Sequence, residues 1–261
     1  MATLSGKRRI WLTGATSGIG RALAVRLLDQ GHLVALSGRS ETALRSLSKG
    51  RSNALPLPLD VTDRDAIDTA GRHLGDLFGH LDMAILNAGT CEYLDPPHLD
   101  SALVERVFAV NFFGAVYCTT AALPLLRLAR EQGGRPQLAA TSSASAYLAL
   151  PRAEAYGASK AALSYYLESL RLDLAHEGID ISVIHPGFVA TPLTERNDFA
   201  MPMRISAEAA ATAIIAGLAK RRFDIHFPRR FTLGIRLLGL LPPSLRFRLG
   251  RQLARHAAME S

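Results

Sequence analysis

Short runs of apolar residues alternate along this chain with longer segments in which apolar residues recur every three to four positions. A short continuous apolar run predicts a buried strand, and the three-to-four-residue recurrence predicts a helix with one apolar face. The predicted strands cover residues 10–12, 32–37, 55–59, 83–86, 137–140, 179–184 and 224–227. The predicted helices cover residues 21–28, 40–47, 63–78, 103–126, 156–174 and 206–218, the fourth being interrupted at Pro124. We find no internal repeat and no domain linker in this alternation.

Two stretches depart from the regular pattern. Pro56 and Pro58 lie in the predicted strand 55–59, and they favour a place near the edge of a sheet because proline cannot donate a hydrogen bond to a neighbouring strand. Residues 191–204 show no periodicity, and a loop of this length inside a compact domain is usually functional. The sequence therefore predicts an edge strand at 55–59 and a lid at 191–204.

The first predicted strand runs into a glycine-rich turn that opens the first predicted helix. The turn reads Thr13-Gly14-Ala15-Thr16-Ser17-Gly18-Ile19-Gly20. Gly14 permits a tight turn, Gly18 lets a ligand approach the backbone, and Gly20 lets the helix pack closely on the strand. The free N–H groups and the positive dipole end of the helix suit a diphosphate. The alternative is a tight strand-to-helix loop that binds nothing.

The second predicted strand ends at Gly38-Arg39-Ser40, where a dinucleotide-binding fold places the adenosine ribose. An Asp or Glu at this point would bind the 2′-hydroxyl of NAD and repel a 2′-phosphate. The guanidinium of Arg39 can instead pair with a phosphate. The sequence therefore favours NADP(H) over NAD(H), and the alternative is an arginine in a solvated loop.

Polar residues also follow other predicted strands. Asn87-Ala88-Gly89 follows strand 83–86, and open α/β sheets bind ligands at such carboxyl ends. Asp60-Val61 follows strand 55–59 and could reach an adenine edge, while Asp60 could also cap the next helix. Asn111 lies among apolar residues in the middle of helix 103–126, so we expect it to be buried and to have a polar role.

Tyr156 and Lys160 lie four residues apart at the start of helix 156–174, so they project from the same helix face. A free tyrosine has a pKa of ~10, and a nearby ammonium lowers that pKa toward the range useful for proton transfer at neutral pH. The alternative is an ordinary pair on an exposed helix surface. We interpret His185, which follows strand 179–184, as a packed strand residue rather than a catalyst.

Composition limits the class of protein. The 261 residues are 48% apolar, which is ample for a sizeable core in one large α/β domain or two small ones. Cys91 and Cys118 have no metal-type spacing, so we expect no metal site, no disulfide framework and a reducing, cytoplasmic location. We find no signal peptide and no run of 18 apolar residues, so we expect no membrane-spanning helix.

Taken in order, these motifs resemble the short-chain dehydrogenase/reductase family. The resemblance covers residues 7–191 and is specific in order and spacing, with Ser143 thirteen residues before Tyr156. It implies one Rossmann-like α/β domain, a doubly wound seven-stranded parallel sheet with helices on both faces. It also implies an oxidoreductase that transfers a hydride between a nicotinamide cofactor and a carbonyl or alcohol carbon.

The resemblance assigns roles to particular residues. Tyr156 is expected to be the general acid in carbonyl reduction, or the base in alcohol oxidation. Lys160 is expected to bind the nicotinamide ribose and to lower the pKa of Tyr156, and Ser143 to bind the substrate oxygen. Asn111 is expected to hold a water in a proton relay to Lys160. The expected cofactor-binding residues are Gly14, Thr16, Ser17, Gly18, Ile19, Gly20, Arg39, Asp60, Val61, Asn87, Ala88, Gly89, Tyr156, Lys160, Pro186, Gly187, Val189 and Thr191. The expected substrate pocket is bordered by Cys91, Ser145, Tyr147, Leu148, Leu150, Phe188 and the loop 191–204.

One departure bears on the cofactor. Some NADP(H)-using members of the family carry a basic residue within the glycine turn, where this chain has Thr16 and Ser17. The NADP(H) preference therefore rests on Arg39, with Ser37 or Ser40 as additional polar groups, and NAD(H) remains the alternative cofactor.

The excess positive charge lies near the C-terminus. The net charge is +7, and residues 220–261 hold ten Lys and Arg against two acidic residues. These basic residues alternate with leucine rather than with aromatic stacking positions, which argues against nucleic acid. We divide the chain into a catalytic domain at 1–228 and a basic amphipathic extension at 229–261. The extension either lies on an anionic membrane surface, packs across a subunit interface or over the pocket, or docks an acidic carrier protein.

Two functions remain at this stage. The first is a NADP(H)-dependent carbonyl reductase or alcohol dehydrogenase for a small hydrophobic substrate, which could be lipid-like, in a homodimer or homotetramer. The second is a non-catalytic nucleotide-binding scaffold or sensor. A scaffold would have little use for Asn111, Ser143, Tyr156 and Lys160 together, so we favour the enzyme.

Overall fold

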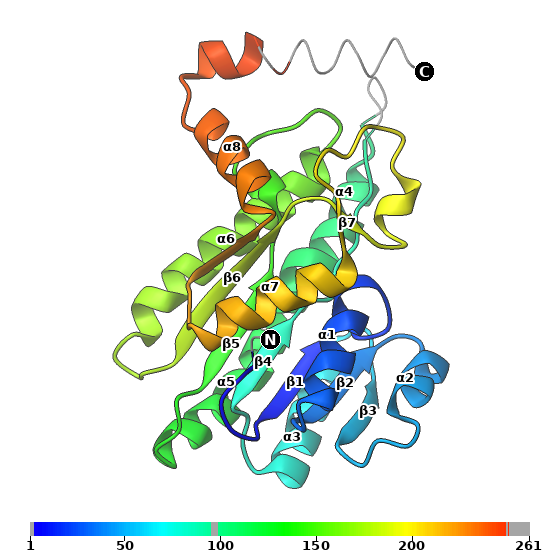
Figure 1. Ribbon diagram of the computed structural model, residues 1–261, viewed down its shortest axis with the longest axis vertical. Coiled ribbons are helices and arrows are strands. Elements are labelled where there is room, and N and C mark those ends of the chain that lie inside the picture. The colour runs from blue at the N-terminus through cyan, green and yellow to red at the C-terminus, as the bar shows by residue number, and fades with distance from the viewer. Residues whose placement is uncertain (1–2, 95–98, 249, 251–261) are drawn as a thin grey trace.

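A seven-stranded parallel sheet forms the centre of the protein, in the order β3-β2-β1-β4-β5-β6-β9 (Figure 1). The computed structural model describes residues 3–94, 99–248 and 250. The strands are β1 (Arg9–Thr13), β2 (Leu33–Gly38), β3 (Ala54–Pro58), β4 (Met83–Leu86), β5 (Gln137–Thr141), β6 (Asp180–Pro186) and β9 (Asp224–Phe227). The predicted α/β class and the seven-stranded parallel sheet are confirmed, and the proline-containing β3 lies at the edge as predicted.

The chain starts in the middle of the sheet and builds outward in both directions. Strand β1 pairs with β2 on one side and with β4 on the other. Thr13, at the end of β1, pairs with Ser37 of β2 and with Leu86 of β4. The loops that follow these three strands therefore leave the sheet at one level, at a topological switch point of the kind that binds ligands in open α/β sheets.

Helices cover both faces of the sheet. One layer contains α3 (Arg64–Phe78), α5 (Gly114–Glu131) and α6 (Glu154–Leu174), and the other contains α1 (Gly18–Asp29), α2 (Glu41–Ser48) and α7 (Ala207–Ala219). Successive side chains of a strand point to opposite faces. Trp11 of β1 accordingly packs into the first layer, whereas Ile10 and Leu12 pack into the second. This burial on both faces explains why the strands read as continuous apolar runs.

One long helical segment contains an irregular turn. Helix α4 (Ser101–Phe108) leads through a π turn (Ala109–Phe113) into α5. The predicted interruption at Pro124 is wrong, because α5 runs through it to Glu131 with the adjacent Leu125 and Leu126 buried in the core. Ser101–Glu131 has the length and mean hydropathy, 1.5, of a membrane span. Its apolar residues include core positions packed against α3 and the sheet, so we assign the segment to the core.

Short side chains cap the helices. Ser40 accepts a hydrogen bond from the Ala43 amide at the start of α2. Asp63 accepts one from the Ala66 amide at the start of α3. The predicted alternative of Asp60 as the cap of this helix is wrong, because the Asp60 carboxylate binds the amide and hydroxyl of Thr62 instead, at 2.9 and 2.8 Å.

Beyond β9 the chain leaves the two helical layers. Helix α8 (Arg229–Gly239) continues past the end of β9, on the side of the molecule where the strands end (Figure 1). A further helical turn follows Pro242-Pro243. Residues 251–261, which belong to the predicted basic extension, lie outside the described part of the chain.

Candidate active site

The glycine turn packs too closely against its neighbours to admit side chains. A Cβ on Gly14, whose φ is +66°, would lie 2.8 Å from the Ala88 backbone. A Cβ on Gly20 would lie 2.0 Å from the carbonyl oxygen of Gly14, and one on Gly18 would lie 2.9 Å from Thr191. The three glycines therefore let β1, α1 and the loops after β4 and β6 converge at one place.

Asn87 ties the ends of three strands together. Its side-chain amide donates to the Gly14 carbonyl at 3.4 Å, and its side-chain oxygen accepts from Thr141, at the end of β5, at 3.1 Å. The Thr13 hydroxyl in turn accepts the backbone N–H groups of Asn87 and Ala88, at 3.1 and 3.2 Å. The 87–89 turn is therefore fixed beside the glycine turn.

Tyr156, Lys160, Ser143 and Asn111 come together at the carboxyl ends of β4 and β5. Lys160 is 3% exposed, and its ammonium donates to the Thr141 carbonyl at 2.8 Å. The Lys160 Nζ lies 6.0 Å from the centre of the half-buried Tyr156 ring. A Cβ on Gly89 would lie 3.3 Å from this Nζ and 3.1 Å from Asn111 Oδ1, so Gly89 packs tightly against both side chains.

The π turn presents Asn111 to this site. Asn111 is fully buried, and its side-chain oxygen accepts the Thr90 amide at 2.9 Å. Its side-chain nitrogen donates to the Thr90 carbonyl at 2.9 Å and to the Ser159 hydroxyl at 3.0 Å. Asn111 thus joins α4–α5 to the loop after β4 and to α6, the helix that carries Tyr156 and Lys160. A π turn inside a helix is frequently found at functional sites.

Burial governs the electrostatics of the pair. Burial raises the pKa of Tyr156 above 10, Cys91 raises it further, and a hydrogen bond from Ser143 lowers it. Burial lowers the pKa of Lys160 to about 8. The expected lowering of the Tyr156 pKa by Lys160 is therefore not what dominates in this structure, because both groups lose hydration and each is shifted toward its neutral form.

The comparisons with known proteins agree with this geometry. The family model described as short chain dehydrogenase matches residues 8–200. This chain belongs to the short-chain dehydrogenase family. It is 33% identical over 249 residues to an uncharacterized oxidoreductase of Myxococcus xanthus, covering 94% of this chain and 96% of that protein. It is also 33% identical over 200 residues to 11-beta-hydroxysteroid dehydrogenase 1A of Arabidopsis thaliana, covering 73% of this chain and 54% of that protein.

Solved structures show the same fold. A short-chain dehydrogenase from Streptomyces avermitilis has a TM-score of 0.80 and 25% identity, and the match covers 97% of this chain and 98% of that one. A short-chain dehydrogenase/reductase from Burkholderia phymatum, solved in complex with NAD, has a TM-score of 0.79 and 23% identity, covering 88% of this chain and 92% of that one. The protein is thus an oxidoreductase of a family that uses nicotinamide dinucleotides on small carbonyl and alcohol substrates.

The expected substrate pocket of this short-chain dehydrogenase begins at Cys91 and the turn after β5. Cys91 is half-buried and close enough to Tyr156 and Lys160 to act on the pKa of both. The Ser143 hydroxyl accepts the Ser145 amide at 3.1 Å. The Ser145 hydroxyl oxygen is buried and, among the described residues, has no hydrogen-bond partner. Leu148 and Leu150 are half-buried in the same loop.

An aromatic cluster covers this end of the molecule, and most of it was not singled out from the sequence. Phe199, from the predicted lid at 191–204, packs against Tyr93 and Phe188, with ring centres 5.6 and 6.1 Å away. Phe188 also contacts Phe231 of α8 at 5.2 Å. The sequence predicts Phe188 and the loop 191–204 near the pocket, but not Tyr93 and Phe231, which lie far from that loop along the chain.

Arg152 joins the loop 191–204 to the segment that precedes α6 through an ion pair. Its guanidinium binds both carboxylate oxygens of Asp198, at 3.0 and 2.9 Å, and lies 5.8 Å from the centre of the Tyr93 ring. The loop is otherwise irregular, with a short 3-10 turn at Thr194–Arg196 and a two-residue pairing of β7 (Val189–Ala190) with β8 (Ile205–Ser206). Residues 191–204 therefore contact the loop after β4 through the rings of Phe199 and Tyr93.

Tyr147, an expected residue of the substrate pocket, takes part in a network of charged side chains beside that pocket. Its hydroxyl donates to Asp224 at 2.9 Å, and its ring lies 4.4 Å from that of His185. Asp224 also binds His185 Nδ1 at 2.9 Å and the guanidinium of Arg236 on α8. On its other side His185 Nε2 lies 3.1 Å from the Ser164 hydroxyl of α6. His185 is thus a buried strand residue, as interpreted, and the network joins β6, β9, α6 and α8.

The predicted adenosine end of the cofactor site lies across the sheet from this network. Arg39 is exposed and, within the described residues, forms no ion pair. The predicted help from Ser37 is wrong, whereas that from Ser40, which is exposed, stays a prediction. The Ser37 hydroxyl is fully buried and accepts the Trp11 indole N–H at 2.9 Å, and the Ser40 hydroxyl caps α2.

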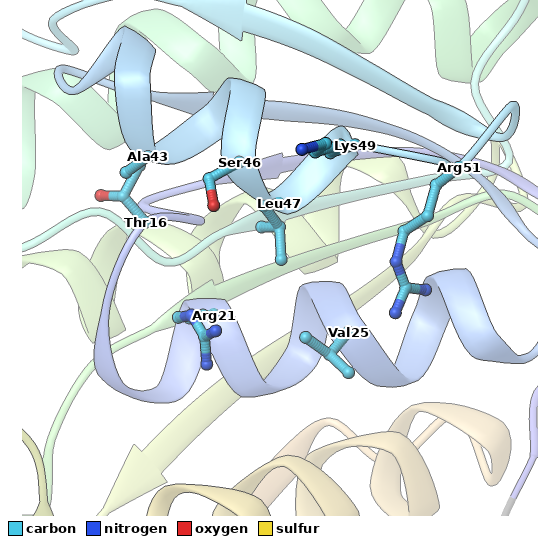
Figure 2. Close-up of a pocket in the computed structure, with 8 residues that line it drawn as sticks. All are labelled: Thr16, Arg21, Val25, Ala43, Ser46, Leu47, Lys49 and Arg51. Carbon is cyan, nitrogen blue, oxygen red and sulfur yellow. The ribbon is translucent and has the colours of Figure 1, made fainter.

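A cavity of about 270 Å³ opens next to the adenosine end, between α1 and α2. Figure 2 shows its lining, which consists of Thr16, Arg21, Val25, Ala43, Ser46, Leu47, Lys49 and Arg51. Arg51 is paired with Asp29 at 2.6 Å, whereas Arg21 and Lys49 have no ion-pair partner among the described residues. Thr16 links this cavity to the predicted ribose position, since a Cβ on Gly38 would lie 2.9 Å from its methyl group.

The remaining expected cofactor residues surround the same edge of the sheet. Val61 is buried against Gly114, and Asp60 is half-buried beside it. Pro186 ends β6, and the Gly187 amide donates to the Phe227 carbonyl at 2.7 Å. Val189 is 2% exposed, and Thr191 touches the glycine turn at Gly18.

Proposed function

We propose that this chain is a NADP(H)-dependent oxidoreductase that reduces a carbonyl group on a small hydrophobic substrate, or oxidises the corresponding alcohol. The convergence of Ser143, Tyr156, Lys160 and Asn111 beside the glycine turn carries this proposal. Carbonyl reduction needs a proton donor, a group that orients the oxygen and a cofactor held next to both. The cluster offers the first two, and the glycine turn adjoins it.

The residues present fit a dinucleotide. Ser17, at the N-cap of α1, makes no side-chain hydrogen bond to the helix, so the first-turn N–H groups of α1 are left for a ligand. The three glycines of the turn let its backbone pack directly against Ala88 and Thr191, and they leave its outer face without side chains as a backbone cradle. The diphosphate would lie on this cradle, and the 87–89 turn would border the nicotinamide half.

Each catalytic side chain has a defined part in the reaction. A nicotinamide cofactor bound beside these residues would supply or accept the hydride. Tyr156 gives its hydroxyl proton to the substrate oxygen, and Ser143 orients that oxygen through a hydrogen bond. Lys160, with a pKa of about 8, exchanges protons readily near neutral pH and holds its ammonium at the Thr141 carbonyl. Lys160 passes a proton on to restore the Tyr156 hydroxyl. Asn111 fixes the loop after β4 and holds a water that replaces this proton on Lys160.

The charges around the adenosine end support NADP(H). Arg39 and Lys49 lie near Thr16 and form no ion pair within the described residues, and Arg21 lies in the same region, where its charge also acts on the Glu208 carboxylate. A 2′-phosphate in this region would face positive charge, whereas NAD(H) would leave the charge uncompensated.

The lining of the lid supports a hydrophobic substrate. Tyr93, Phe188 and Phe199 present aromatic surface on the side where Tyr156 and Cys91 lie. Apolar walls with a few placed polar groups are typical of sites for small hydrophobic molecules.

We further propose a homodimer or homotetramer in the cytoplasm. Tyr165 and Leu172 on α6 are 74% and 78% exposed, and Phe113 and Leu128 are exposed on the adjoining helical segment. Apolar side chains gathered on neighbouring helices favour a subunit interface. Free cysteines at 91 and 118 support a reducing compartment.

The alternative is a scaffold or sensor that binds NADP(H) without turnover. No observation favours a scaffold, because a protein without turnover would not need Tyr156 to be gathered with Ser143, Lys160 and Asn111. NADPH oxidation by the purified protein, tested against a panel of hydrophobic aldehydes and ketones, separates the two functions. The enzyme consumes NADPH with at least one carbonyl compound, and the scaffold binds NADPH and consumes none.

Arg39→Ala tests the cofactor preference. We expect the wild-type protein to bind NADPH at least about tenfold more tightly than NADH, and the variant to lose most of this difference, because one charge-assisted contact is worth ~1.4 kcal/mol or more. Titration calorimetry with both cofactors measures the two affinities. Arg64→Ala, on α3, is the matched control. Equal affinities in the wild-type protein would contradict the NADP(H) preference.

A further inference from the structure

Exposed apolar side chains are concentrated in α8 and the turn that follows it. Thirteen large apolar side chains are exposed in the described residues, and six of them lie between residues 233 and 247. These six are Leu233, Leu237, Leu238, Leu240, Leu245 and Phe247. Large exposed apolar patches mark interaction surfaces.

Helix α8 is amphipathic and turns Leu233, Leu237 and Leu240 away from the rest of the protein. Thr232 is fully buried and hydrogen-bonded to His226, and Arg236, one turn later, binds Asp224. Gly239, a further turn on, packs against the Tyr147 carbonyl. Leu233, Leu237 and Leu240 follow each of these inward positions by one residue and are 44%, 65% and 82% exposed. One stripe of α8 therefore holds it on the protein while the neighbouring stripe faces outward.

The charge around the patch has a single sign. Residues 225–248 contain five arginines and no Asp or Glu. Arg229, Arg230 and Arg248 are exposed, whereas Arg236 is paired with Asp224. An apolar stripe with an arginine-rich border matches the headgroups and acyl chains of an anionic lipid surface.

A second copy of the chain fits this surface less well. A twofold interface brings the same patch of both subunits together. Here it would place arginines opposite arginines with no acidic side chain from residues 225–248 to separate them.

We propose that the outward stripe of α8 docks on an anionic lipid bilayer surface, with Leu233, Leu237 and Leu240 inserted among the lipids and Arg229, Arg230 and Arg248 at the phosphates. The helix lies in the plane of the interface, since eleven residues are too few to cross a bilayer.

The same helix borders the substrate side of the site. Phe231 of α8 contacts Phe188, and Arg236 lies over the Tyr147 ring at 5.0 Å. A protein docked through the outer face of α8 holds the carbonyl site next to the lipid. Delivery of an apolar carbonyl substrate from the bilayer rests on the proposed function, whereas docking itself does not.

Vesicle co-sedimentation of the full chain, without substrate, tests the docking. Vesicles of phosphatidylcholine alone are compared with vesicles containing phosphatidylglycerol, at low and at high salt. We expect sedimentation with the anionic vesicles only, weakened by salt. Leu237→Asp and the double variant Arg230→Gln/Arg248→Gln should each weaken binding about tenfold.

Two matched variants on α3 serve as controls. Leu77→Asp replaces another exposed leucine, 53% exposed, and Arg64→Gln/Arg72→Gln removes the same charge from a different face. Both should sediment like the wild-type protein. Circular dichroism of every variant reports that the fold is intact, and vesicle binding is measured whether or not any cofactor is bound or any carbonyl compound is turned over.

Three results would overturn the proposal. The protein stays in the supernatant with both kinds of vesicle, or it binds both kinds equally. In the third, the wild-type protein is a dimer that binds no vesicles, and sedimentation velocity shows that Leu237→Asp dissociates this dimer. The outer face of α8 would then join two copies of the chain.

Discussion

At the residue scale, burial decides the chemistry of the catalytic pair. Tyr156 and Lys160 lie on one face of α6, and both are withdrawn from water, so each resists ionisation. The sequence predicts their shared helix face because residues four apart are neighbours on a helix. It could not predict the direction of the Tyr156 pKa shift, which depends on how deeply the strands and the lid bury the ring.

The Lys160 pKa has a consequence for stability. Burial lowers the pKa of Lys160 from 10.5 to about 8. In the cofactor-free protein, between these two pH values, Lys160 is therefore protonated in the unfolded chain and neutral in the folded protein. The stability that neutral Lys160 contributes is present above pH 10.5 and is lost as the pH falls through 8. The variant Lys160→Met has no ionisable group at this position, so its stability lacks this pH dependence. We expect the unfolding free energy of the wild-type protein, relative to this variant, to fall by about 2 kcal/mol between pH 10 and pH 7.5.

Urea unfolding of both proteins at the two pH values measures this difference. A difference that stays constant, or that grows in favour of the wild-type protein at pH 7.5, would mean that Lys160 keeps its proton in the folded protein.

At the element scale, the glycine turn and the π turn fix the site. The glycine spacing is visible in the sequence, and the structure gives each glycine a neighbour that excludes a side chain. The π turn is not visible in the sequence, because the helical periodicity of residues 103–126 continues through it. The apolar neighbours of Asn111 were the available signal, and they correctly indicated that it is buried.

Gly20→Ala tests the close contact between α1 and β1. Its Cβ would lie 2.0 Å from the Gly14 carbonyl and 2.6 Å from the Asn87 side chain, so α1 must shift. We expect a loss of ~2 kcal/mol or more in unfolding free energy, together with weaker NADPH binding. Gly234→Ala, in α8, is the control because a Cβ there meets nothing within 4 Å. Alanine should stabilise that helix by up to ~1 kcal/mol.

Denaturant unfolding distinguishes these outcomes. If Gly20→Ala is as stable as Gly234→Ala and binds NADPH normally, the close packing of the turn is not needed for the cofactor site.

At the scale of the whole molecule, the functional groups gather where the strands end. The alternation of strands and helices predicts most of this arrangement, and the prolines of β3 predict its place at the edge of the sheet. The aromatic cluster of Tyr93, Phe188, Phe199 and Phe231 could not be predicted, because it joins four segments distant in sequence. The pairing of Tyr147 and Arg236 with Asp224 likewise depends on where β9 delivers α8.

The steady-state rate of NADPH oxidation with a hydrophobic carbonyl substrate, in the wild-type protein and in Tyr156→Phe, tests the account most directly. Tyr165→Phe, an exposed residue on the same helix, is the control. The account predicts that Tyr156→Phe loses roughly 10²–10⁴-fold in turnover while NADPH affinity is retained, and that Tyr165→Phe turns over like the wild-type protein. Turnover by Tyr156→Phe at the wild-type rate, or no turnover by the wild-type protein with any carbonyl compound, would contradict it.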